Sequence, residues 1–232
     1  MYIGYHSTFW ILLPAIIFTV IVQGRVKRTF NRYSLAKTEK GMTGAKAARY
    51  LLDKNGLTNV KIVQIAGSMT DNYDPRKNVL NLSQTVYDVD SIAAVSVACH
   101  EVGHALQYAE GYLPIKIRNA IVPVVNFASM LTWPMLAIGI VLLASRNLEF
   151  GNILFNVGII LFLVVILFHL VTLPTEFNAS KRAIAQMEEY GIVEHEEIVG
   201  SKKVLNAAAM TYVASLAMAV ANLLRILAMR KR

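Results

Sequence analysis

Three long windows of the chain contain no charged side chain, and they limit the fold more than any other feature. They cover residues 1–24, 119–145 and 151–175, with histidine counted as neutral. Each is long enough for a helix that crosses a hydrocarbon core of roughly 30 Å, which takes about 20 residues. A membrane interior has no water to satisfy an open backbone, so each window is predicted to be a transmembrane helix.

The composition agrees with this prediction. Charged residues make up 16% of the 232 positions, whereas a soluble domain usually has about a quarter of its residues charged. A large soluble protein could bury such windows as core helices, but three of them in so short a chain would leave little surface to cover them. The first window lacks a basic start, so it is predicted to stay in place as an anchor.

The net charge of +8 is concentrated beside the apolar windows. The basic residues gather in four places, at 25–61, 116–118, 181–182 and 202–203. Under the positive-inside rule, the N-terminus and the 146–150 link face outward, while 25–118 and 176–203 face the cytoplasm. Anionic lipid is the simpler partner for charges in these places, and no binding of nucleic acid is expected.

A fourth apolar stretch, 204–224, leaves two alternatives open. It is uncharged but rich in alanine and in polar side chains. If it spanned the membrane, the basic tail from Arg225 onward would face outward, against the charge rule. A helix packed on the cytoplasmic segments at the membrane surface is therefore slightly favoured over a fourth span.

Short elements are predicted after the first window. Thr43 can cap a helix that runs through Leu52 and stops at Asn55-Gly56. Residues 59–65 alternate well enough for a strand. Asp74-Pro75 marks a turn, which predicts a small hairpin of two short strands.

Two more helices are predicted further along. One begins at Asp90 or Ser91 and ends by Gly111, and the other covers residues 181–190. The one cysteine of the chain, Cys99, lies on the first of these helices. No intrachain disulfide can form, and a lone buried thiol is expected to be an apolar filler and not a metal ligand.

Residues 100–104 read His-Glu-Val-Gly-His. Positions four apart lie above one another on a helix, so His100 and His104 can bind one Zn²⁺. Glu101 lies one residue round the helix, where it can act as general base without occupying a coordination position. Gly103 lets another element approach closely. The alternative is a pair of exposed or hydrogen-bonded histidines beside a surface glutamate.

A catalytic zinc site needs a third protein ligand and an open position for water. Glu176 is the expected third ligand, because it follows the third window on the side predicted for the motif. It lies 72 residues after His104, and removal of the hydrophobic hairpin 120–173 leaves a spacer of about 18 residues. The alternative is a helix-start carboxylate that follows Pro174.

With these residues in place, the chain resembles the YugP-like neutral zinc metallopeptidases of bacterial membranes along nearly its whole length. The matching stretches are 41–45, 67–76, 91–105 and 174–180. The chain is more distantly similar to HtpX-type and prenyl-protease-type membrane peptidases. The resemblance implies a gluzincin-like site with zinc on His100, His104 and Glu176, and with Glu101 catalytic. The distant relatives have Asp where this chain has Ser180, which could still hydrogen-bond a ligand histidine.

Two further groups of residues could contribute to catalysis. Residues that stabilise the oxyanion or orient a ligand are expected among Ser180, Arg182, Tyr212 and His195. A strand that binds an extended substrate is expected in the hairpin, at Thr70, Asp71, Asn72 and Tyr73. The alternative for this strand is an ordinary covered edge.

The sequence thus predicts a mainly α membrane protein with three transmembrane helices, a possible fourth, and a zincin-like α+β catalytic domain that contains a small β-hairpin. Its expected parts are an N-terminal anchor (1–24), a cytoplasmic catalytic part (25–119), a transmembrane hairpin (120–173), and a segment with the third ligand and the C-terminal apolar helix (174–232).

The expected function is that of a membrane-embedded zinc metalloendopeptidase with one Zn²⁺ per chain. It would hydrolyse peptide bonds at the cytoplasmic face of the bacterial cytoplasmic membrane. Its expected partners are membrane lipid, a peptide or membrane-protein substrate, and a regulatory or oligomeric membrane partner. A catalytically silent zinc-binding scaffold, or pseudo-protease that binds a partner, is the alternative.

Overall fold

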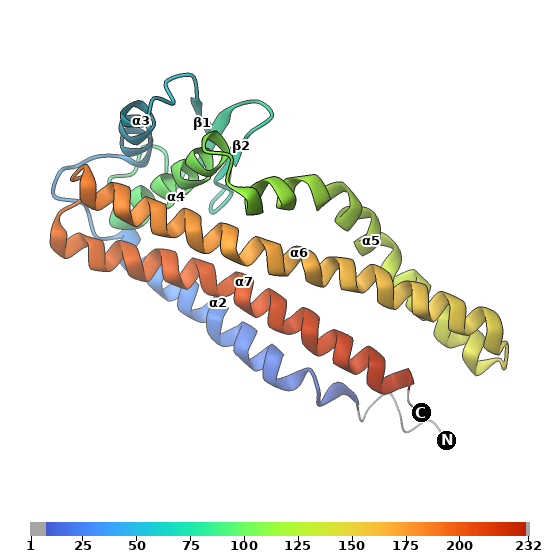
Figure 1. Cartoon of the computed structure of the whole chain (residues 1–232). Helices are drawn as coiled ribbons and strands as arrows, with labels where there is room; N and C mark the ends of the chain where they lie inside the picture. Colours follow the sequence, from blue (N-terminus) through green and yellow to red (C-terminus); the bar gives the residue numbers. More distant parts are fainter. Residues whose placement is uncertain (1–7, 231–232) are drawn as a thin grey trace. The chain divides into compact units, whose positions relative to one another are not determined.

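Long helices form most of the chain, and a small sheet accompanies them (Figure 1). The structure is a computed structural model that describes residues 8–230. The helices are α2 (Leu13–Ser34), α3 (Gly44–Lys54), α4 (Ile92–Ala109), α5 (Leu113–Ala144), α6 (Leu148–Glu189) and α7 (His195–Arg230). The strands are β1 (Lys61–Ile65), β2 (Asn72–Asp74) and β3 (Val79–Ser83). The prediction of a mainly helical chain with a little sheet is confirmed.

Three of the described helices, α5, α6 and α7, are long and apolar enough to cross a membrane. Helix α5 contains most of the predicted second window, and α6 contains all of the third. The first window is only partly described, because residues 1–7 lie outside the described residues. From Leu13 onward, α2 continues past the apolar residues to Ser34 and is not one of the three. A span in 1–24 therefore stays a prediction.

The C-terminal apolar stretch belongs to α7, which is one continuous helix. Lys203 and Arg225 are 22 residues apart on this helix. That separation corresponds to about 33 Å of α-helix, close to the thickness of a hydrocarbon core. Together with the length and composition of α7, it favours the spanning alternative over a helix at the membrane surface.

Helix α6 corrects two expectations from the sequence. The third window and the predicted helix 181–190 form a single helix of 42 residues, with Pro174 inside it. A proline removes one backbone hydrogen bond, but membrane helices tolerate the loss because neighbouring groups satisfy the freed carbonyl. Glu176 therefore lies within a helix, and the alternative of a helix-start carboxylate is wrong.

The sheet has the strand order β1-β3-β2. Strands β2 and β3 pair antiparallel, with Asp74 opposite Val79, so the predicted hairpin is confirmed. Strand β1 pairs with β3 in parallel, a pairing that the sequence did not predict. Among the described strands, β2 therefore has one partner and forms an edge of the sheet.

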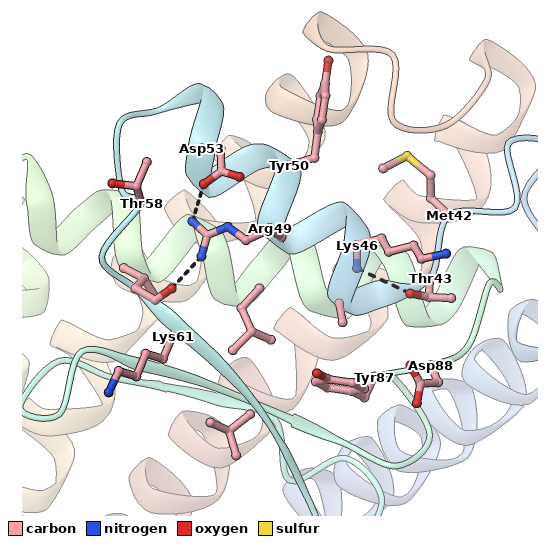
Figure 2. Close-up of a pocket in the computed structure, with 14 residues that line it drawn as sticks. Met42, Thr43, Lys46, Arg49, Tyr50, Asp53, Thr58, Lys61, Tyr87 and Asp88 are labelled. Atoms are coloured by element: carbon pink, nitrogen blue, oxygen red, sulfur yellow. Dashed lines mark hydrogen bonds and ion pairs between the residues drawn. The ribbon is translucent and has the colours of Figure 1, made fainter.

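The predicted caps fix the ends of the two helices beside the sheet. Thr43 accepts a hydrogen bond from a backbone N–H in the first turn of α3, and Asn55 follows its last residue (Figure 2). Arg49 donates to the Val60 carbonyl at 2.6 Å, which holds α3 on the segment that enters β1. Ser91 caps α4 in the same way as Thr43 caps α3. Both predicted helix starts are confirmed.

The chain forms two compact units. One consists of 116–173 with the described parts of 1–21 and 212–232, and the other of 22–115 and 174–211. The second unit has a hydrophobic core made by α3, β3, α4 and α6, whose fully buried members include Leu51, Leu80, Val102 and Met187. All three predicted metal ligands belong to this second unit.

Candidate metal centre

The two histidines of the motif lie together on α4. The centroids of the His100 and His104 rings are 4.8 Å apart, and the rings meet edge-on at 85°. Their side chains are 15% and 10% exposed. The pair therefore forms a mostly buried site that keeps limited access to solvent.

Helix α6 brings Glu176 against this pair. Its Oε2 lies 3.4 Å from Nε2 of His100 and 3.5 Å from Nε2 of His104. The carboxylate is only 2% exposed. A carboxylate buried to this extent is costly unless it is paired or binds a metal, so its position between two imidazoles indicates a specific role.

The spacing of these atoms fits a tetrahedral zinc site. Bonds of about 2.0–2.1 Å to a tetrahedral ion place neighbouring donor atoms about 3.3 Å apart. Ligand atoms of His100, His104 and Glu176 all lie within 4.8 Å of one another. Two imidazole nitrogens and one carboxylate oxygen are donors that zinc accepts, and they leave a fourth position open. The three residues could therefore hold Zn²⁺.

Hydrogen bonds orient both imidazoles toward Glu176. Nδ1 of His100 lies 3.1 Å from Oγ of Ser180, so the contact expected of Ser180 is present. Nδ1 of His104 lies 3.0 Å from Oε1 of Gln107. Because an amide oxygen only accepts, Nδ1 of His104 donates to Gln107, and Nε2 is the ring nitrogen that can bind a metal when the ring is neutral.

Gln107 is a residue of the site that the sequence reasoning missed. It is fully buried, and its Nε2 donates to the Thr175 carbonyl at 2.8 Å and to Oδ1 of Asn178 at 3.0 Å. These bonds tie α4 to the turn of α6 that carries Glu176. Gln107 lies three residues after His104, on the same face of the helix. This spacing is the sequence signal from which its contact with His104 could have been predicted.

Arg182 extends this network. Its Nε donates to Oδ1 of Asn178 at 2.7 Å, and its Nη1 donates to Oε1 of Glu110 at 2.7 Å. Arg182 thus holds the amide that binds Gln107. Its role as an oxyanion donor stays a prediction.

The other two candidates of this group lie elsewhere on the chain. His195 begins α7, and among the described residues it makes no hydrogen bond or ion pair with the metal-site residues. Tyr212 belongs to the other compact unit. Their roles also stay predictions.

Glu101 belongs to the same unit but not to the ligand group. Its side chain is buried, and burial raises the pKa of its carboxyl group, although the imidazoles of His104 and His100 oppose this shift. A carboxyl group whose pKa is raised toward neutrality is suited to take up a proton and to return it.

Cys99 is part of the hydrophobic core of this unit. Burial raises the pKa of its thiol well above the ordinary value. Because the thiolate is the form that binds metals, this position disfavours a ligand role. The structure agrees with the prediction of an apolar filler.

Strand β2 lies against the helix of the motif. The ring of Tyr73 meets the ring of Tyr108 edge-on, with centroids 6.1 Å apart. Tyr108 follows His104 by one helical turn. The backbone N–H of Ser83 donates to the Asp71 carboxylate at 2.7 Å, which fixes the segment before β2. The four substrate-strand candidates lie in β2 or just before it: Thr70, Asp71, Asn72 and Tyr73.

Gly103 permits the close contact between α4 and α6. A Cβ atom at this position would lie 2.5 Å from the backbone oxygen of Ala179. Ala179 is three residues after Glu176, so the missing side chain sets the distance between the helices that carry the ligands. The predicted close approach at Gly103 is confirmed.

We expect Gly103→Ala to weaken zinc binding by at least about tenfold and to destabilise the fold by about 1–3 kcal/mol, because the backbone of α6 must move away. Competition with a chromophoric chelator would measure zinc affinity, and thermal unfolding would measure stability. Gly24→Ala is the control, because a Cβ atom there would have no neighbour within 4 Å. Zinc affinity equal to that of wild type would contradict the prediction.

The three long apolar helices and the group of His100, His104 and Glu176 define the class: a membrane protein with a two-histidine, one-glutamate metal site of the kind that zinc hydrolases use. A family model described as "Putative neutral zinc metallopeptidase" matches residues 8–231. The chain therefore belongs to this zinc metallopeptidase family.

Similarity to a curated protein extends over most of the chain. The chain is 47% identical over 203 residues to "Putative membrane protease YugP" of Bacillus subtilis (strain 168). The aligned region covers 88% of this chain and 87% of that protein. No solved structure matches the chain. The resemblance found from the motifs is thus confirmed.

Proposed function

We propose that the chain is a membrane-embedded zinc metalloendopeptidase in which Glu101 is the general base. One observation carries the proposal: the Nε2 atoms of His100 and His104 and the Oε2 of Glu176 lie at coordination spacing, and Glu101 stands next in sequence to His100 but outside this group. A site that only bound zinc would not need this additional carboxylate.

The chemistry follows from the residues of the site. A bound Zn²⁺ would supply a Lewis acid that activates water and polarises the scissile carbonyl. The Glu101 carboxylate takes a proton from the attacking water and returns it to the leaving amine. Burial favours the second transfer, because it raises the pKa of this carboxyl group. Gln107 and Ser180 hold the imidazoles in place while the proton moves.

An extended peptide is the substrate form that the hairpin suits. Strand β2 has a single partner among the described strands, and its Tyr73 packs on the motif helix. A peptide could add to this edge through backbone hydrogen bonds, with the residues from Thr70 to Tyr73 as its contacts. The proposed substrates are therefore unfolded peptide segments, either free or part of membrane proteins.

The proposed location is the bacterial cytoplasmic membrane, with the site on the cytoplasmic side. Three apolar helices and the name of the Bacillus relative support a membrane protein. The basic clusters beside the apolar segments support the orientation under the positive-inside rule. Membrane lipid and a regulatory or oligomeric membrane partner complete the proposed set of partners.

Removal of the metal tests the proposal. We expect the detergent-purified protein to hold about one Zn²⁺ per chain and to cleave a quenched peptide library. A chelator should abolish cleavage, and stoichiometric zinc should restore it. Zinc binding without any cleavage would support the scaffold alternative. Failure to bind zinc under metal-replete conditions would overturn the metallopeptidase assignment.

A further inference from the structure

Outside the metal centre, a hollow of about 380 Å³ lies between α2 and α7. We call it the basic hollow, because four cationic side chains line it: Arg25, Arg28, Arg32 and Lys203. No acidic residue lines it. Among the described residues, none of the four cations has a carboxylate partner.

Regular spacing on both helices builds the basic hollow. Residues 25, 28, 29 and 32 of α2 and residues 203, 206, 207 and 210 of α7 line it. Each set follows the i, i+3, i+4, i+7 pattern, so each is one face of its helix. Two helix faces thus meet along two turns, which distinguishes the hollow from a scatter of surface lysines and arginines.

The rim and the floor of the hollow differ in polarity. The four cations are exposed at the rim, whereas Ala207 is buried, and Thr29 and Tyr33 are half-buried. A close packing contact sets the position of Tyr33, because a Cβ atom at Gly200 would lie 2.7 Å from its ring. The floor is therefore a fixed apolar and hydroxyl-bearing surface, and the rim offers guanidinium and ammonium donors.

The hollow lies at the boundary between the apolar and the polar segment of each helix. Arg25 is the first charged residue of the chain, directly after the apolar part of α2. Lys203 directly precedes the apolar stretch 204–224 of α7. Residues at such a change lie at the headgroup level of a membrane, where cations attract anionic lipid.

We propose that the basic hollow binds the phosphate of an anionic phospholipid headgroup. Arginine suits this ligand because its planar guanidinium can donate two parallel hydrogen bonds to phosphate oxygens. The half-buried hydroxyls of Thr29 and Tyr33 are further donors. The site contains none of the residues assigned to catalysis.

The test uses the full chain in detergent and native mass spectrometry with added phosphatidylglycerol or phosphatidylcholine. We expect wild type to prefer phosphatidylglycerol. Arg28→Gln with Arg32→Gln should weaken that binding about 25-fold, since each basic group near anionic lipid contributes roughly a factor of five. Lys27→Gln is the matched control, because it removes a charge from α2 outside the hollow and should leave the preference unchanged.

A second variant keeps the test decisive if the double variant folds poorly. Lys203→Gln changes one exposed rim charge on the other helix and should weaken binding about fivefold. Equal binding of the two lipids, or an equal loss in Lys27→Gln, would overturn the proposal. Displacement of the lipid by inorganic phosphate alone would also overturn it, because the ligand would then be a soluble phosphate.

Discussion

Replacement of Glu101 by glutamine is expected to reduce peptide cleavage by about 100- to 10,000-fold, the usual contribution of a general acid–base residue. Glutamine keeps the shape of the buried side chain but cannot accept the proton. Zinc content should stay at the wild-type level, because Glu101 is not one of the grouped ligand residues. Cleavage of a quenched peptide library and metal analysis of the same preparation would measure both effects.

The control for this variant is Glu189→Gln, which makes the same chemical change at an exposed position on α6. It should leave both cleavage and zinc content unchanged. Full activity of Glu101→Gln would assign the general base to another residue. Loss of zinc together with activity would show that Glu101 supports the metal directly and would contradict the proposed division of roles.

Local signals in the sequence were sufficient to predict the elements near the site. Thr43 and Ser91 are caps whose hydroxyls bind the first turn of a helix, and each acts within four residues. The turn at Asp74-Pro75 likewise joins strands that are adjacent in sequence. The spacing of His100 and His104 is fixed by the helix that carries them. Such features depend on residues that are close along the chain, so they can be predicted from the sequence alone.

Features that depend on distant parts of the chain could not be predicted in the same way. The parallel pairing of β1 with β3 depends on the path of the segment between them, which contains β2. The continuity of α6 through Pro174 depends on neighbouring groups that can satisfy the carbonyl freed by the missing hydrogen bond. Gln107 acquires its role only because the carbonyl of Thr175 lies opposite, 68 positions later in the chain.

The third ligand shows how the two kinds of information combine. In the sequence, two features favour Glu176: its predicted side of the membrane, and the short spacer after His104 that remains without the hydrophobic hairpin. The structure adds that Glu176 lies within a continuous helix, α6, and that its carboxylate meets both histidines of α4. Gly103 permits this contact, because without a Cβ atom it lets the backbone of α6 at Ala179 approach α4 closely.

We expect Glu176→Ala to lower zinc affinity by more than about 100-fold, because loss of a residue that merely supports a ligand already costs about 10- to 100-fold. Two imidazoles on one helix would remain, and zinc sites of this type need three protein ligands. Peptide cleavage should fall with zinc occupancy. Zinc affinity would be measured by chelator competition on the detergent-purified variant, with Glu189→Ala as the control on the same helix.

The alanine variant separates the ligand role from a purely structural one. The contact between the helices should survive in it, because Gln107 binds the backbone carbonyl of Thr175 and the side chain of Asn178, not the side chain of Glu176. Thermal unfolding of the metal-free protein should therefore change much less than zinc affinity does. A large loss of metal-free stability with unchanged zinc affinity would reverse this interpretation, since Glu176 would then hold the histidines together and the third ligand would lie elsewhere.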